Sequence, residues 1–405
     1  MRDGWTEMTL GDMAEVNPET TKGMPPQQHI RYIDLSAVSA DSGIDESAVI
    51  DYELRSAPGR ARRVVRHGDV LVSTVRPYLR GFAVVPESLD GAVASTGFTV
   101  LRARKELSLP GFVWSIVSKA DFADRLMERA TGSNYPAVRP NDIAEQVVLL
   151  PPLVVQRRTV DLIDRIDTYA LRARTCWGAA RSIRSALLDD LLFPRGDERW
   201  ATTTVGDVVR LVKRGRAPAY ADDGLVVLSQ KCVREENTLE LGAARCTDAD
   251  KRPIPDWAYV TVGDTLVAST GRGTLGRASY VAALPFDATV DSHVTIVRPE
   301  SELVLPAYLG LVLSAMRSEL EAYGSGSTNQ TELSREAISS ISIPLPPGSV
   351  QHDIVNLIDA FDSAIRPISS IVEALTSVRS SMLDELLSGE REIPPSYDEL
   401  VGLVM

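Results

Sequence analysis

The second half of this chain repeats the first. Trp5 and Trp200 stand 195 positions apart in a sequence of 405 residues, and short motifs keep that offset throughout. The other pairs at the same offset are Gly11-Asp12 with Gly206-Asp207, Gly68-Asp69 with Gly263-Asp264, Asn134 with Asn329, Ile143 with Ile338, Pro151-Pro152 with Pro346-Pro347, Gln156 with Gln351, Leu162-Ile163-Asp164 with Leu357-Ile358-Asp359, and Leu191-Leu192 with Leu386-Leu387. A chance similarity would not hold one offset over this length, so the sequence predicts a tandem duplication.

Each repeat is predicted to contain a mixed α/β domain followed by a long helix, which gives an α+β fold class. Short β-rich runs at 70–74 and 265–270 lie between Gly, Pro and Asp and predict strands. Apolar spacing predicts helices over Phe112–Arg129 and Pro306–Tyr323. The predicted parts are a first domain at 1–150, a central helix at 151–195, a second domain at 196–345, a distal helix at 346–388 and an acidic C-terminal tail at 389–405.

The two long segments carry matching heptad seams. Steps of three and four residues select, in the central segment, Ile163, Ile166, Ala170, Ala173, Trp177, Ala180, Arg184, Leu187 and Leu191. The distal segment gives Ile358, Phe361, Ile365, Ile368, Val372, Leu375, Arg379, Met382 and Leu386. Both seams are apolar except for one arginine at the same place in each. This pattern predicts that the helices pair as an antiparallel coiled coil on the order of 60 Å long, the alternative being that each packs on its own domain.

Proline 367 is the one residue that conflicts with the distal helix. It lies off the seam, but it lacks the amide hydrogen that an interior helical position donates. We therefore expect it to kink or interrupt the distal helix.

Composition narrows the class of protein. Hydrophobic residues make up 44% and charged residues 24% of the chain, which fits a globular protein with several cores. The three cysteines form no C-x-x-C pattern, which argues against structural zinc and for a reducing compartment. No signal-peptide pattern and no membrane-length apolar run occur. The sequence predicts a cytoplasmic protein without a membrane partner.

Charge is unevenly distributed along the chain. The formal net charge is -12, which by itself argues mildly against nucleic-acid binding. Two clusters are nevertheless strongly basic, one at Arg60, Arg62 and Arg63 and the other at Lys213, Arg214 and Arg216. These clusters are candidates for phosphate contacts, with a solvated surface as the equal alternative.

No motif predicts a cofactor, a metal or a catalytic site on this chain. Residues 271–276 form a G-x-G-x-x-G, but they lead into a predicted strand at 277–281, whereas a dinucleotide site needs a helix there. The histidines form no metal-ligand pair. Asp161, Asp164 and Asp167 stand at helical spacing, and we expect a solvated or partner-facing acidic strip.

The order of these segments resembles the specificity subunit of a type I restriction-modification enzyme. The resemblance rests on the opening Trp-x-x-x-x-(Leu/Val)-Gly-Asp, the Gly-Asp-x-Leu-Val strand followed by Ser-Thr, the Gly-Ser-Asn loop, and the Pro-Pro-Leu-x-x-Gln before a long helix. The second copy departs from the last motif, since Gly348 replaces Leu. The second Gly-Ser-(Thr)-Asn loop also contains Thr328 before its Asn. With these two differences, all four motifs occur in the same order twice, so the resemblance covers nearly the whole chain.

The resemblance implies a non-catalytic subunit that reads a split sequence in double-stranded DNA. Each domain would be a target-recognition domain for one half-site, and the paired helices would set the spacing, with half-sites roughly 34 Å apart. The helices would also bind two modification subunits, which methylate adenine with S-adenosylmethionine, and restriction subunits would complete the complex. The alternatives are a coiled-coil adaptor without DNA readout and the remnant of a fused restriction-methylation enzyme.

Two loops at matched positions supply the candidate DNA-binding residues, because Arg, Asn, Gln and hydroxyl side chains suit contacts to phosphates and base edges. The first-domain candidates are Ser73, Thr74, Arg76, Tyr78, Arg80, Ser133, Asn134 and Tyr135. The second-domain candidates are Arg214, Arg216, Ser269, Thr270, Arg272, Thr274, Arg277, Ser327, Thr328, Asn329 and Gln330. The asparagines have a turn-forming role as the alternative.

Overall fold

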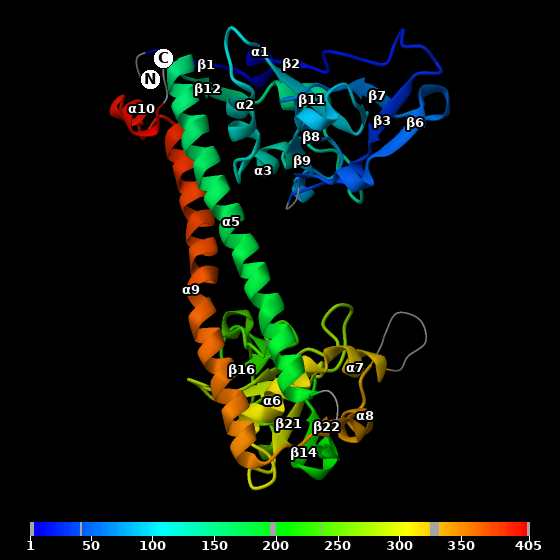
Figure 1. Ribbon diagram of the computed structural model, residues 1–405, viewed down its shortest axis with the longest axis vertical. Helices are drawn as coiled ribbons and strands as arrows, with labels where there is room; N and C mark the ends of the chain where they lie inside the picture. The colour runs from blue at the N-terminus through cyan, green and yellow to red at the C-terminus, as the bar shows by residue number, and fades with distance from the viewer. Residues whose placement is uncertain (1–3, 41–42, 195–199, 236, 325–331, 403–405) are drawn as a thin grey trace. The chain divides into compact units, whose positions relative to one another are not determined.

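The computed structural model describes residues 4–40, 43–194, 200–235, 237–324 and 332–402 (Figure 1). The chain divides into two compact units, one made of Met1–Arg174 and Ser370–Met405 and the other of Thr175–Ser369. Two 40-residue helices, α5 (Leu153–Leu192) and α9 (Gly348–Leu387), each contribute one half to each unit. Among the described residues, no helix has both the length and the apolar content needed to cross a membrane.

The first unit contains two four-stranded sheets. One has the order β2-β11-β8-β9 and is antiparallel throughout, and the other has the order β6-β3-β10-β7 with a parallel β3–β10 pair. Strands β1 and β12 form a separate antiparallel pair, and so do β4 and β5. The strands are β1 (Thr6–Thr9), β2 (Ala14–Val16), β3 (His29–Ile33), β4 (Val38–Ser39), β5 (Gly43–Ile44), β6 (Ile50–Glu53), β7 (Ala61–Val64), β8 (Val70–Ser73), β9 (Phe82–Val84), β10 (Val93–Ser95), β11 (Phe98–Ala103) and β12 (Val147–Leu150). The helices are α1 (Leu10–Met13), α2 (Pro110–Val117), α3 (Phe122–Met127), α4 (Pro140–Ala144) and α10 (Ser396–Val401).

The second unit repeats the first sheet and varies the second. The order β14-β21-β18-β19 matches β2-β11-β8-β9. The other sheet, β15-β17-β16-β20, keeps a parallel pair but differs at both edges, since the pair is central in the first unit and β20 is an edge strand in the second. The strands are β13 (Thr202–Thr204), β14 (Val209–Arg214), β15 (Tyr220–Ala221), β16 (Leu225–Leu228), β17 (Arg245–Thr247), β18 (Thr265–Ala268), β19 (Ala278–Tyr280), β20 (Ala288–Val290), β21 (Val294–Pro299) and β22 (Ser342–Pro344). The helices are α6 (Pro306–Ala315), α7 (Arg317–Ala322) and α8 (Arg335–Ser340). The predicted duplication is therefore present in the fold.

Each predicted domain helix is in fact two helices. The patterns expected over 112–129 and 306–323 divide into α2 and α3 and into α6 and α7. The break re-aims the second helix so that Phe122 and Leu126 in one unit, and Leu320 in the other, are fully buried. Periodicity alone could not detect this break because both helices of each pair are apolar on the buried side.

The Gly-Asp motif holds the repeated sheet together. Asp69 follows Gly68 into β8 and pairs with Arg102 of β11 at 2.8 Å, and Asp264 pairs with Arg298 in the second unit at 2.7 Å. Both carboxylates are buried, with the Asp264 side chain 0% exposed. Gly68 and Gly263 have φ of 83° and 99°, a region that favours glycine. The Gly-Asp motif is thus explained in both copies by a tight turn at the glycine and a buried ion pair at the aspartate.

Replacing Asp264 with Asn is expected to destabilise the second unit by about 3 kcal/mol, because the Arg298 charge would stay buried without its partner. Amide exchange should accelerate in β18 and β21 and remain unchanged in β8 and β11. Asp222→Asn, at an exposed position of the same unit, is the matched control. Equal exchange in the two variants would contradict this role.

The repeated glutamine fixes the start of each long helix. Gln156 donates to the carbonyls of Leu107 and Pro151 and accepts from the amide of Leu109 at 3.0 Å. Gln351 makes the equivalent bonds to Pro346 and Leu305. Both side chains are buried, so their amide groups satisfy backbone atoms that would otherwise lack partners. This explains the Gln of the Pro-Pro motif without any functional role.

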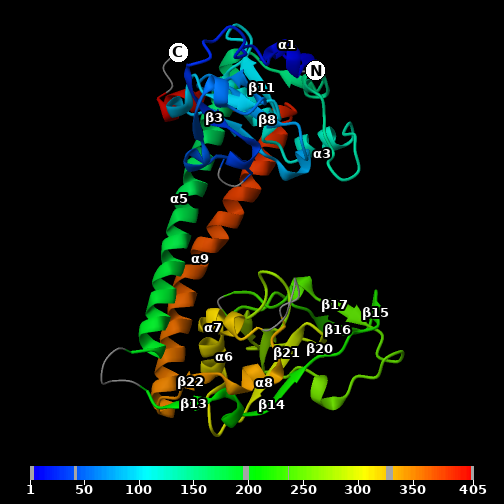
Figure 2. The ribbon, with the colours of Figure 1, turned by 90° about the vertical axis from the view of Figure 1, so that its right-hand side faces the viewer.

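Helices α5 and α9 pair within each unit, as both views show (Figures 1 and 2). Every residue of the two predicted seams is buried or half-buried, and most residues between them are exposed. The seam arginines bind aspartates of the opposite helix. Arg184 and Asp362 form a bidentate pair, and Arg379 contacts Asp167 at 2.5 Å. The helices also pack on the domains, since Ile163 and Leu386 join the first core and Leu188 and Ile358 the second.

Pro367 does not interrupt α9, so that expectation is wrong. The helix runs unbroken from Gly348 to Leu387. Pro367 and Ser363, whose carbonyl would accept from residue 367 in a regular helix, are both exposed. Water can therefore solvate the unpaired carbonyl, and the proline ring faces away from the seam.

The segment after α9 folds back onto the first unit. Ile393 is buried in its core, and Asp398 of α10 forms a bidentate pair with Arg158 of α5 at 2.6 and 2.8 Å. This guanidinium lowers the pKa of Asp398, while burial and the adjacent Asp161 raise the pKa of Tyr397 to about 12. Asp161 also pairs with Arg165. Asp161 and Asp167 thus have cationic partners within the chain, whereas Asp164 is exposed, so the solvated or partner-facing strip stays a prediction.

Candidate nucleic-acid interface

The two candidate loops adjoin in the first unit. The loop after β8 and the segment 131–138 are joined by a hydrogen bond from the Arg76 amide to the Pro136 carbonyl at 2.7 Å. A second bond runs from the Val138 amide to the Thr74 carbonyl at 2.9 Å. Sequence analysis selected these loops separately, and the fold makes them one surface.

The corresponding loops also adjoin in the second unit. The Leu333 amide donates to the Ser269 carbonyl at 2.9 Å, and Thr270 bridges to Glu332. Four candidates of the second loop, Ser327, Thr328, Asn329 and Gln330, lie outside the described residues.

Several candidate residues make hydrogen bonds within the protein. Ser73, Thr74 and Ser269 are buried, and their hydroxyls bond to Val75, Gly97 and Thr295 respectively. Arg80 donates to the carbonyls of Ser118 and Lys119. The hydroxyls of the Ser-Thr motif therefore stabilise the loop through internal hydrogen bonds, and the neighbouring exposed residues are the ones that can contact a ligand.

The exposed candidates of the first unit form an aromatic and cationic patch. The Arg76 guanidinium lies 4.3 Å from the centroid of the Tyr135 ring. Tyr135 is 68% exposed and Tyr78 49% exposed, and Ser133 and Asn134 are exposed beside them. Arg76 has a left-handed backbone with φ of 50°, which costs energy for a non-glycine residue. Arg76 is half-buried, and such backbone strain is typical of functional sites.

The G-x-G-x-x-G segment of the second unit is a tight loop that leads into β19, as predicted from the sequence. Gly271, Gly273 and Gly276 all have positive φ, and a Cβ at Gly271 would lie 2.5 Å from the Gln230 and Thr274 side chains. The Thr274 hydroxyl donates to the Thr270 carbonyl at 3.0 Å. Arg272 is exposed between the first two glycines.

The basic cluster at 213–216 separates into two roles. Lys213 lies 4.2 Å from the centroid of the Trp257 ring, and Arg216 lies 5.9 Å from it. Arg214 instead pairs with Glu332 and donates to the Ser292 carbonyl, and burial lowers its pKa. In the first unit, burial similarly lowers the pKa of Arg63, and Arg62 donates to the Gly59 carbonyl.

The sequence did not predict three residues that form further cation–aromatic contacts in the second unit, namely Trp257, Arg245 and Tyr220. Trp257 stacks with the basic cluster, and Arg245 lies 3.6 Å from the centroid of the Tyr220 ring. Their partners are distant in the sequence and carry no shared motif, so no sequence signal was available.

The exposed patches combine the two elements that single strands and duplex grooves require. Guanidinium and ammonium groups attract phosphates, and planar groups stack on bases or sugars. Within the described residues, no three His, Cys, Asp or Glu side chains form a group that could hold a metal ion. The exposed charged, aromatic and polar side chains of these patches can recognise a ligand by charge, stacking and hydrogen bonding.

One family model matches the second half of the chain. Residues 197–376 match the type I restriction modification DNA specificity domain. The second half of the chain is therefore similar to the DNA specificity domain of type I restriction-modification systems.

The individual relatives are specificity subunits. The chain is 22% identical to the type I restriction enzyme HindI specificity subunit of Haemophilus influenzae over 116 residues, which are 28% of this chain and 25% of that protein. It is 18% identical to the MjaX specificity subunit of Methanocaldococcus jannaschii over 196 residues, which are 47% and 46% of the two chains. The matches thus span less than half the length of either relative. Together with the family match, they confirm the resemblance predicted from the repeated motifs.

Solved structures share the fold over nearly the whole chain. A structure titled "Structural basis underlying complex assembly and conformational transition of the type I R-M system" covers 96% of this chain and 98% of its own, with 23% identity and a TM-score of 0.59. The type I restriction-modification system S subunit from M. genitalium covers 96% and 97%, with 12% identity and a TM-score of 0.56. These likenesses confirm the predicted fold class of duplicated domains with paired long helices.

Proposed function

We propose that this chain is the sequence-specific DNA-binding subunit of a type I restriction-modification system. Its two domains, taken as residues 1–150 and 196–345, each read one half of a bipartite duplex target. The observation that carries this proposal is the repeated sheet. Its loop after β8 presents Arg76 against Tyr135, whereas the loop at the matching position after β18 is the glycine-rich turn that carries the exposed Arg272. Loops of different chemistry on two copies of the same sheet suit a DNA target with two different half-sites.

The chain itself is non-catalytic in this proposal and works in the cytoplasm. Two modification subunits methylate adenine, and restriction subunits add cleavage; S-adenosylmethionine and ATP bind to those partners. The paired helices, taken as residues 151–195 and 346–388, are the binding surface for the modification subunits. The exposed apolar residues Tyr169, Leu171 and Ile183 of α5 and Ile371 and Val378 of α9 support this assignment.

The test is to co-express the chain with the modification subunit encoded beside it and to map methylated adenines by single-molecule sequencing. We expect one bipartite motif with a fixed gap. Replacing residues 1–150 or 196–345 by the corresponding part of a relative should change only one half of that motif. A stable complex that leaves the genome unmethylated, although its modification subunit is active, would refute DNA readout and would favour the adaptor alternative.

A further inference from the structure

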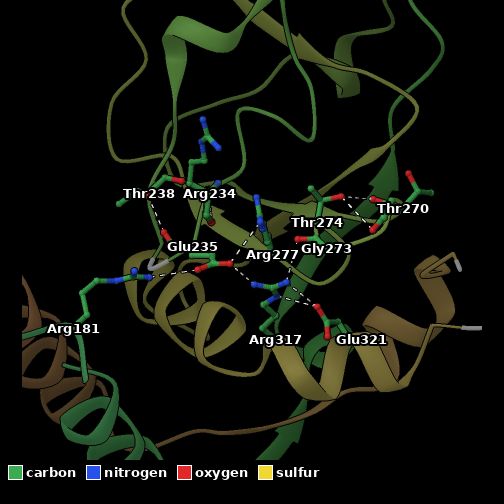
Figure 3. Close-up of polar contacts among 12 residues, drawn as sticks. Arg181, Arg234, Glu235, Thr238, Thr270, Gly273, Thr274, Arg277, Arg317 and Glu321 are labelled. Carbon is green, nitrogen blue, oxygen red and sulfur yellow. Dashed lines mark hydrogen bonds and ion pairs between the residues drawn. The ribbon is translucent and has the colours of Figure 1, made fainter. Parts of the chain in front are cut away.

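Three arginines from separate elements of the second unit meet at one carboxylate (Figure 3). Glu235 contacts Arg317 of α7 at 2.5 Å, Arg181 of α5 at 3.4 Å and Arg277 beside β19 at 3.6 Å. These four residues, named here the Glu235 cluster, line a cavity of about 190 Å³. The arginines lower the pKa of Glu235, so the carboxylate stays charged. It is the shared counter-ion that lets three guanidinium groups approach one another.

The position of Glu235 is fixed by its own loop. The Arg234 amide donates to the Ser279 hydroxyl at 3.2 Å, and that hydroxyl donates to the Thr238 carbonyl at 2.5 Å. Asn237 has φ of 61° and accepts from the Tyr280 amide at 2.8 Å. The loop is thus tied to β19 at several points, and the carboxylate is held in place before any ligand arrives.

The cluster fixes the loop 270–277. Arg317 donates from a second nitrogen to the Gly273 carbonyl at 3.2 Å, and Arg277 closes the same loop at its other end. The Thr274 hydroxyl secures the middle through Thr270, as Figure 3 shows. The exposed Arg272 is carried by this fixed backbone.

The first unit fixes its equivalent loop in another way. Arg80 donates to the backbone carbonyls of Ser118 and Lys119, and Lys119 pairs with Asp384 of α9. Among the described residues of the first unit, Glu19 pairs with two arginines, Arg66 and Arg102, and no ion pair brings three arginines to one carboxylate. The Glu235 cluster is therefore a feature of the second unit, and it affects the loop of the second domain alone.

We propose that Glu235 is a positioning residue for half-site recognition by the second domain, an inference that rests on the proposed function. Its carboxylate orients Arg317 and Arg277, and these hold the loop 270–277 so that Arg272 meets the duplex in one geometry. Pre-organised contacts discriminate between sequences because a displaced loop loses its directional hydrogen bonds.

The experiment uses the full complex and duplexes altered in one half-site at a time. Discrimination is the ratio of the Kd for the altered duplex to the Kd for the intact target. Glu235→Gln should lower this ratio on the order of tenfold for changes in the half-site of the second domain, and it should leave the ratio for the other half-site unchanged. Glu235→Asp should restore part of it. Glu336→Gln, which removes an exposed carboxylate paired with Arg335 in the same unit, is the matched control.

Equal discrimination in Glu235→Gln and the wild type would overturn the inference, and so would an equal loss at both half-sites, which indicates general destabilisation. Should Glu235→Gln fail to fold, Arg317→Gln removes the contacts to Glu235, to Glu321 and to the Gly273 carbonyl, and it carries the same expectation. A wild-type complex that discriminates at neither half-site would instead refute the proposed function, and this inference with it.

Discussion

Replacing Arg184 with Asp is expected to separate α5 from α9 in the second unit and to cost about 3 kcal/mol of stability. The Arg184 side chain is 5% exposed, and its guanidinium bonds both oxygens of Asp362. The variant removes those bonds and places two carboxylates together in the seam, where water screens them poorly. Amide exchange in residues 175–192 and 348–369 should accelerate.

The charge-reversed variant Arg184→Asp/Asp362→Arg is the control, and it should recover most of the loss. The equivalent pair in the first unit, Arg379 with Asp167, should keep its protection throughout. An Arg184→Asp chain as stable as the wild type would show that the pair has no role in helix pairing.

The same pair is expected to specify register more than stability. Arg184→Leu/Asp362→Leu should be near the wild type in stability, because a buried ion pair and an apolar pair of similar size differ little. Cysteine cross-linking across the seam should then capture several registers where the wild type gives one. A single polar seam position has this effect in coiled coils.

Replacing Arg76 with Ala is expected to weaken DNA binding by the complex by about tenfold to a hundredfold. Arg76 is the cation of the exposed patch in the first unit and stacks on Tyr135. A phosphate contact would weaken all sequences alike and reduce the salt slope by about 1, whereas a base contact would relax one position of the motif. Titrations at several salt concentrations separate the two.

Arg55→Ala is the control for this prediction, because Arg55 is an exposed arginine of the same unit that pairs with Glu53. Tyr135→Ala should weaken binding less than Arg76→Ala, since it removes the stacking surface and leaves the charge. If Arg76→Ala and Arg55→Ala bind alike, the loop after β8 is not part of the interface.

The sequence by itself determined the architecture. A constant offset of 195 residues required two copies of one fold, and a heptad seam with a single arginine in each copy required two helices that face each other. These features can be found in the sequence because they depend on the spacing of residues along one element and on the repetition of the same elements in both copies. Two pairs of buried polar residues keep the same structural role in both copies, Asp69 with Asp264 and Gln156 with Gln351.

Only the tertiary structure decided which residues of the candidate loops face solvent. Ser73, Thr74 and Ser269 belong to the repeated framework and are buried, whereas Tyr135 and Arg272 are exposed. The stacking of Lys213 on Trp257 and the convergence of Arg181, Arg277 and Arg317 on Glu235 join residues from separate elements. Such long-range contacts have no period in the sequence, because they depend on how strands and loops are brought together in space rather than on the order of residues along one element.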